Sequence, residues 1–285
     1  SRYVSAHVTP SSRAGATVKQ AAAQPWLEVL ERLGYVVRGL VYGLMGWLAF
    51  QLAMGGGGTA IDQAGSIVIL AGTPLGRPIL LMVVIGLAAY SLWGFVRAIF
   101  DPWRRGTDAS GIAQRLGYAW SGFAYATLAM FALHLFASGR ATAIDSTQAA
   151  VRSLLTYPTG RLLAVFLGIL TIGAGIAQFV DARKAFSQAG VVKEDTPPEV
   201  RRPLLWLGRF GMFSRGVVFM LVGWFVIQAG LHRDPASAHG FQGAFTFLLA
   251  QPYGHLFLAV VALGFIALGL HSLALARWAR LLRSS

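Results

Sequence analysis

One eleven-residue motif occurs three times in this chain, and it constrains the fold more than any other feature. The copies begin at Arg32, Arg115 and Arg209, and all follow Arg-Leu/Phe-Gly-x-x-x-Arg/Ser-Gly-x-x-Tyr/Phe. Self-similarity of this kind is the mark of a repeat architecture, in which one supersecondary unit is used several times. The chain is therefore expected to contain three equivalent units, each opened by one copy of the motif.

Each unit contains two long apolar runs, so the chain contains six. Only 12% of the 285 residues are charged, about half the share usual in soluble domains. A helix needs about 20 mostly apolar residues to cross a bilayer. The six runs that meet this length are residues 33–54, 79–100, 116–137, 162–180, 210–229 and 256–276. The runs lack the two-residue alternation of a membrane β-barrel, so six transmembrane helices are predicted.

The second run of each unit has a recurrent start of its own, Pro-x-Gly followed by a basic residue. The prolines of this start are Pro74, Pro158 and Pro252, and proline is well tolerated in the first turn of a helix. A shorter segment with weaker helical character precedes each start, at residues 61–70, 144–155 and 241–250. We expect these segments to be short interfacial helices on the extracytoplasmic side.

The basic residues predict the orientation of the chain in the membrane. The net charge is +13, and 19 of the 24 Lys and Arg residues lie on the side that holds both termini. Lys and Arg are enriched in cytoplasmic loops, so both termini are predicted to be cytoplasmic in the cell (inner) membrane. The excess charge then reflects this bias and an attraction to anionic lipid headgroups, and it gives no support to nucleic-acid binding.

These observations divide the chain into five parts. We expect a polar cytoplasmic tail at 1–25, a first repeat at 26–105, a second at 106–185, a cytoplasmic linker at 186–203 and a third repeat at 204–285. Because each repeat holds two spans, all three enter the membrane in the same direction. The predicted fold class is an all-α integral membrane protein, with three parallel two-helix repeats around a pseudo-threefold axis.

The triplicated motif, together with the Pro-x-Gly starts, resembles a bacterial membrane family known only as domain of unknown function 1206. The resemblance covers about residues 30–278. It implies six spans in three two-helix units and no activity, so no catalytic residue can be transferred. The second copy departs from the pattern at Ser121, and the third at Phe219 and His255. A site with threefold symmetry would therefore be imperfect.

The first candidate site is formed by two equivalent positions of the motif. Arg38, Ser121 and Arg215 occupy one position, and Tyr42, Tyr125 and Phe219 the other, four residues further on and hence on the same helix face. Charge at this depth in an apolar run is costly and faces protein or water. The two positions predict a ring that binds an anion or a headgroup. The simpler alternative, which we favour, is snorkelling or a structural bond to a neighbouring helix.

Two further sets of polar residues align between the repeats. Gln51, His134 and Gln228 lie near the outer ends of the first spans, where they would form either a polar ring in a pore or interhelical hydrogen bonds. Asp62 and Asp145 precede the second spans, where they would cap short helices or pair with arginines. A cation site is the less favoured alternative. The spacing of His232, Asp234, His239 and His255 matches no known metal motif.

The functional hypotheses follow from what the sequence contains. It has no cysteine and no hydrolase, metalloprotease or dinucleotide-binding motif, so we expect no enzymatic activity, no cofactor and no metal. The leading hypothesis is a helix bundle that binds or passes a small solute, ion or lipid along its axis. The alternative is an accessory or scaffolding subunit that docks other membrane subunits. Sequence alone does not identify a substrate or a partner.

Overall fold

The computed structural model describes residues 25–57, 59–100, 109–140, 146–183 and 196–278, and these form helices joined by short connections. Six helices are long: α2 (Pro25–Ala53), α4 (Gly76–Phe100), α5 (Ala109–Ser138), α7 (Gly160–Arg183), α8 (Pro198–His232) and α10 (Gly254–Trp278). Three are short: α3 (Gln63–Ala71), α6 (Ser146–Leu155) and α9 (Phe241–Leu249). A 3-10 turn, η1 (Pro235–Ser237), precedes α9.

Five of the six apolar runs lie within long helices, and the first extends one residue beyond the end of α2. Each long helix is long and apolar enough to cross a membrane. The short helices coincide with the three segments expected between the spans. The predicted linker at 186–203 falls partly outside the described residues, and from Pro198 onward the chain is helical. The predicted tail at 1–25 also lies almost entirely outside them.

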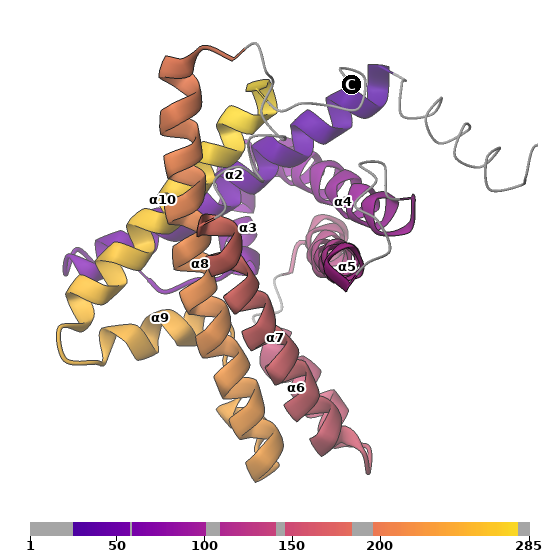
Figure 1. The fold of residues 1–285 in the computed structure, drawn as a ribbon, viewed down its shortest axis with the longest axis vertical. Coiled ribbons are helices and arrows are strands. Elements are labelled where there is room, and N and C mark those ends of the chain that lie inside the picture. Colours follow the sequence, from indigo (N-terminus) through magenta and orange to yellow (C-terminus); the bar gives the residue numbers. More distant parts are fainter. Residues whose placement is uncertain (1–24, 58, 101–108, 141–145, 184–195, 279–285) are drawn as a thin grey trace, which may run out of the picture.

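The closest helix packing joins different repeats rather than the two helices of one repeat. α4 packs against α5, α7 against α8, and α10 against α2, while α2 with α4 and α8 with α10 form less extensive contacts. The second helix of each repeat therefore pairs with the first helix of the next repeat, and the third repeat returns to the first. Figure 1 shows the three pairs running in different directions from a common centre.

The first residue of the motif connects the two helices of each such pair. Arg115 Nε donates to the carbonyl of Ala98 (2.8 Å), Arg209 Nε donates to that of Ala182 (2.7 Å), and Arg32 Nη1 donates to that of Ala276. The last carbonyls of a helix have no partner within the helix and carry partial negative charge. A cation from the neighbouring helix satisfies them here, at equivalent positions in all three pairs.

Glycines let the paired helices approach closely. A Cβ at Gly46 would lie 2.6 Å from the backbone nitrogen of Ile266 on α10, and a Cβ at Gly168 would lie 2.7 Å from the carbonyl oxygen of Gly223 on α8. Membrane helices associate through packing of this kind, because lipid chains provide no hydrophobic driving force between them.

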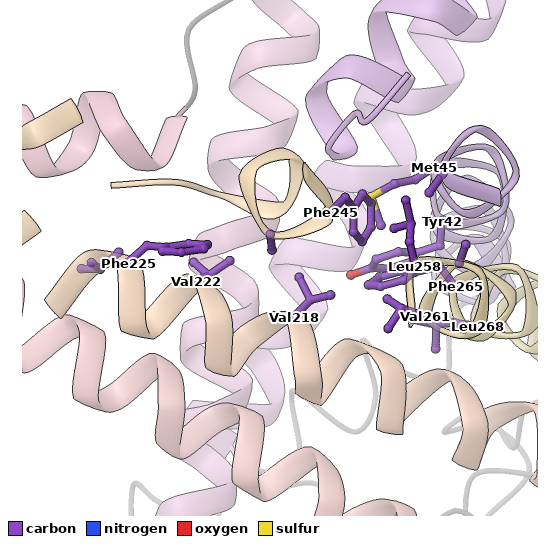
Figure 2. Packing of buried hydrophobic residues seen from close by; sticks show 14 of the residues in the cluster. Tyr42, Met45, Val218, Val222, Phe225, Phe245, Leu258, Val261, Phe265 and Leu268 are labelled. Carbon is purple, nitrogen blue, oxygen red and sulfur yellow. The ribbon is translucent and has the colours of Figure 1, made fainter. Parts of the chain in front are cut away.

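The short helices contribute side chains to the interior of the protein. Phe245 of α9 is fully buried and packs edge-on against Phe265 of α10, with ring centroids 5.5 Å apart. Figure 2 shows this ring in a buried apolar cluster with Tyr42 and Met45. Val151 of α6 belongs to the same cluster. The interior beyond Tyr42, toward the C-terminal end of α2, is therefore filled by apolar side chains. The side of the membrane on which the short helices lie stays a prediction.

The arginine contacts between repeats lead to a first testable prediction. Arg209→Gln should lower the midpoint of thermal unfolding in detergent, because a hydrogen bond that involves a charged group contributes about 1.5 kcal/mol or more. Arg202→Gln is the matched control, since Arg202 is exposed on the same helix. Equal midpoints for the two variants would show that the arginine of the motif does not hold the pair together.

Candidate functional site

The candidate site lies at the centre of the molecule and is built around Arg38 of α2. Its Nη1 donates to the Tyr90 hydroxyl of α4 at 2.8 Å. Its Cζ lies 5.6 Å from the ring centroids of both Tyr42 and Tyr90, within the range of a cation–π contact. Arg38 is thus held against two aromatic rings, and its hydrogen bond to α4 is of the structural kind that the simpler alternative expects.

Arg215 of α8 approaches the same tyrosine. Its Cζ lies 4.8 Å from the centroid of Phe219 and 6.0 Å from that of Tyr42. Arginines from repeats one and three are therefore both in contact with one aromatic ring. Like charges brought together in this way repel each other unless an anion lies between them.

Tyrosine hydroxyls form the neutral part of the site. The hydroxyls of Tyr42 and Tyr125 lie 3.4 Å apart, and the rings of Tyr90 and Tyr125 meet edge to face at 4.6 Å. Ser121 is half-buried one turn before Tyr125 on α5. The structure thus brings together Arg38, Arg215, Tyr42, Tyr125 and Phe219.

No carboxylate pairs with Arg38 or Arg215 in the part of the chain that the structure describes. The charged and polar groups acting on Arg38 are tyrosines, and the Nε atoms of both arginines are buried without a hydrogen-bond acceptor. A buried polar atom without a partner costs about 1–3 kcal/mol, and an unpaired charge costs more. The site therefore combines positive charge with unused donors.

Sequence reasoning missed two residues of this region, Tyr90 and Arg97 of α4. Arg97 Cζ lies 5.0 Å from the ring centroid of Trp93 and 5.9 Å from that of Tyr90. Both residues belong to the second span of repeat one, whereas the motif lies in the first span of each repeat. Tyr90 and Arg97 are seven residues apart, which places them on one face of the helix. This spacing was the feature of the sequence that could have identified them.

The other predicted polar set does not form a common site. Gln51 and Gln228 are half-buried and His134 is exposed, and no contact among the described residues connects the three. The buried histidine is instead His271 of α10, whose Nδ1 lies 2.9 Å from the carbonyl oxygen of Leu204 on α8. A histidine at a helix–helix contact is thus part of the packing.

Asp62 is the N-cap of α3 and accepts the backbone N–H of Gly65 at 2.8 Å. Asp145 lies outside the described residues. Asp234 caps η1 by accepting the backbone N–H of Ala236, and His239 packs edge-on against Phe225. Within the described ranges, no three acidic, His or Cys side chains are placed to hold a metal ion.

Comparison with known proteins identifies the repeats. The family described as "Domain of Unknown Function (DUF1206)" matches three segments, residues 33–101, 116–185 and 210–279. An uncharacterized protein of Bacillus subtilis (strain 168), YxxB, is 32% identical over 254 residues, which cover 88% of this chain and 90% of that protein. No solved structure matches.

The unpaired charge leads to a second prediction. In anion-poor detergent buffer, Arg215→Met should raise the midpoint of thermal unfolding, by an amount equivalent to about 1 kcal/mol in the free energy of unfolding. The variant loses a cation–π contact worth about 0.5–2 kcal/mol, but it also removes a poorly solvated charge, and we expect the second effect to be larger. Arg209→Met, which loses a hydrogen bond to α7, should lower it. A fall of similar size in both variants would mean that Arg215 is structural.

Proposed function

The chain is a multi-pass membrane protein that belongs to the DUF1206 family, and we propose its function from the chemistry of its interior. The description of the family names no activity. The protein binds an anionic group between Arg38 and Arg215 and does not catalyse a reaction on it. The observation that carries the proposal is the pair of buried Nε donors that have no acceptor among the residues the structure describes.

The donor set favours an oxyanion. A guanidinium presents planar N–H groups that match the oxygens of a phosphate or carboxylate. The hydroxyls of Tyr42 and Tyr125 lie beside the arginines and can donate to the same ligand. An anion there would also reduce the repulsion between the two cations. The ligand class is therefore a phosphate or carboxylate group.

Binding is better supported than passage through the protein. Beyond Tyr42, the residues of α2 that face the interior are Met45, Ala49 and Ala53, all buried in an apolar cluster. Val151 of α6 and Phe245 of α9 complete this cluster. A charged solute would have to leave the tyrosines and cross this apolar cluster, which is costly.

The arrangement and topology are part of the proposal. The pairing of α4 with α5, α7 with α8 and α10 with α2 supports a pseudo-threefold axis along the membrane normal, as do the equivalent contacts of the three motif arginines. The distribution of Lys and Arg supports cytoplasmic termini in a bacterial inner membrane.

The rival function, an accessory or scaffolding subunit, is favoured by one observation. α5 and α7 expose more of their spans than the other long helices do, and these faces would suit other membrane subunits. This role requires no buried cation without a counter-charge, so the anion site is the better explanation of the interior.

Anion binding gives the third prediction. Inorganic phosphate should raise the midpoint of thermal unfolding of the wild-type protein in an uncharged detergent. At a phosphate concentration of one hundred times its Kd, the free energy of unfolding should increase by about 2.7 kcal/mol. The double variant Arg38→Gln/Arg215→Gln should show no such rise, because the donors are removed. Differential scanning fluorimetry against phosphate concentration measures both.

Arg202→Gln/Arg233→Gln is the matched control, since it removes two positive charges at exposed positions. It should keep the phosphate response. A phosphate response in the Arg38/Arg215 double variant, or none in the wild type, would contradict the proposed site and leave the scaffolding function as the better candidate.

The topology gives the fourth prediction. The chain has no native cysteine, so a single introduced thiol can be labelled selectively. Tyr253→Cys, at the exposed turn before α10, should react with a membrane-impermeant maleimide in intact cells. Arg202→Cys, near the start of α8, should react only after permeabilisation. The reverse pattern would invert the proposed orientation.

A further inference from the structure

The contact between the two helices of a repeat is closed in repeats one and three and open in repeat two. A Cβ at Gly34 would lie 3.2 Å from Tyr90 of α4, and a Cβ at Gly211 would lie 2.7 Å from Leu268 of α10. Their equivalent in repeat two, Gly117 of α5, has no atom within 4 Å of the same position. α5 and α7 are also not among the extensively packed helix pairs of the described chain. In Figure 1, α5 lies beside α4 and α7 beside α8.

The residues at this contact explain the difference. Where the helices cross in repeat one, Val37 packs on Gly86, and in repeat three Ser214 packs on Gly264. A Cβ at Gly264 would lie 1.8 Å from Ser214 Oγ, so glycine is needed for this approach. The equivalent residues in repeat two are Trp120 and Leu170.

Repeat two therefore has two large side chains at the positions where the other repeats place a small residue against glycine, and their bulk opposes a close approach of α5 and α7. Val37 and Ser214 are 0% and 1% exposed, whereas Trp120 and Leu170 are 45% and 47% exposed. We call the gap bounded by Gly117, Trp120 and Leu170 the α5–α7 opening. It has apolar walls.

The opening adjoins the anion site. Ser121, which follows Trp120, takes the place that Arg38 and Arg215 take in the other repeats. The short side chain leaves room where an arginine would project and still offers a hydroxyl donor. Tyr125, one turn further along α5, is part of the site itself. Helix α5 thus carries both the apolar residues of the opening and, one turn further along, residues beside the arginines.

We propose that the ligand is one anionic phospholipid, with an acyl chain in the α5–α7 opening and its phosphate between Arg38, Arg215 and Ser121. This inference rests on the proposed function and names the ligand class of the same site. Apolar walls near two guanidinium groups, each with a buried Nε that has no acceptor among the described residues, complement a lipid with an anionic headgroup. A partner helix or a second copy would cover the walls and leave the buried charge uncompensated.

Native mass spectrometry of the delipidated protein with added phosphatidylglycerol tests this proposal. The wild type should retain one phosphatidylglycerol and bind phosphatidylcholine of the same chain length about tenfold more weakly. Gly117→Trp should fill the opening and weaken phosphatidylglycerol binding by at least about tenfold. Ala88→Trp, on an exposed position of α4, is the matched control and should bind like the wild type.

Inorganic phosphate separates this inference from the proposed function. Gly117→Trp should keep the phosphate response, since its arginines are intact. Loss of lipid binding with a retained phosphate response supports entry through the opening. If neither lipid nor phosphate binds to the wild type, both proposals fail. If phosphate binds but phosphatidylglycerol does not, only the lipid inference fails.

Three further results would overturn the lipid inference: equal phosphatidylglycerol binding by Gly117→Trp and the wild type, equal binding of phosphatidylcholine and phosphatidylglycerol, or a wild-type dimer that Gly117→Trp dissociates. If Gly117→Trp does not fold, Trp120→Ser/Leu170→Gly replaces it. This variant copies the contact of repeat three and should close the opening, with the same loss of lipid.

Discussion

The structure depends on pairing between repeats, fixed at one end of each pair by the arginine that begins the motif. This residue donates to the last carbonyls of the preceding repeat, at Ala98, Ala182 and Ala276. Because the third repeat makes its contact with the first, the pairs form a cycle. In a bilayer, unsatisfied carbonyls are costly and few other groups can reach them. The arginine contact therefore fixes which helices of successive repeats pair.

The interior combines two environments with opposite chemistry. On one side of Tyr42, the short helices α6 and α9 help to fill the space with apolar side chains such as Phe245. On the other side, Arg38 and Arg215 are half-buried beside Tyr42, and each has a buried Nε without an acceptor among the described residues. Stability alone would favour apolar residues in both places. In the function we propose, the retained charge serves a ligand, and the loosely packed repeat two would supply the route by which a lipid reaches it.

Much of the fold could be predicted because bilayer thickness converts apolar length into spans. The six long helices contain the expected runs, and α3, α6 and α9 coincide with the expected short segments. The convergence of Arg38, Tyr42, Tyr125, Arg215 and Phe219 followed from matched positions in the motif. Tyr90 and Arg97 were missed because they belong to a span that carries no motif, and Gln51, His134 and Gln228 were grouped by depth alone although no contact connects them.

The sequence by itself determined the number of spans, the threefold repetition and the side chains available at each depth, because these follow from local composition and period. Only the tertiary structure decided which helices pair. An apolar span presents similar faces all round, so composition does not select a neighbour. The choice depends on the contact of particular atoms, such as the arginine donors with helix-end carbonyls and the glycines with facing backbone. The same contacts distinguish Gly117 from Gly34 and Gly211, although the motif makes the three equivalent.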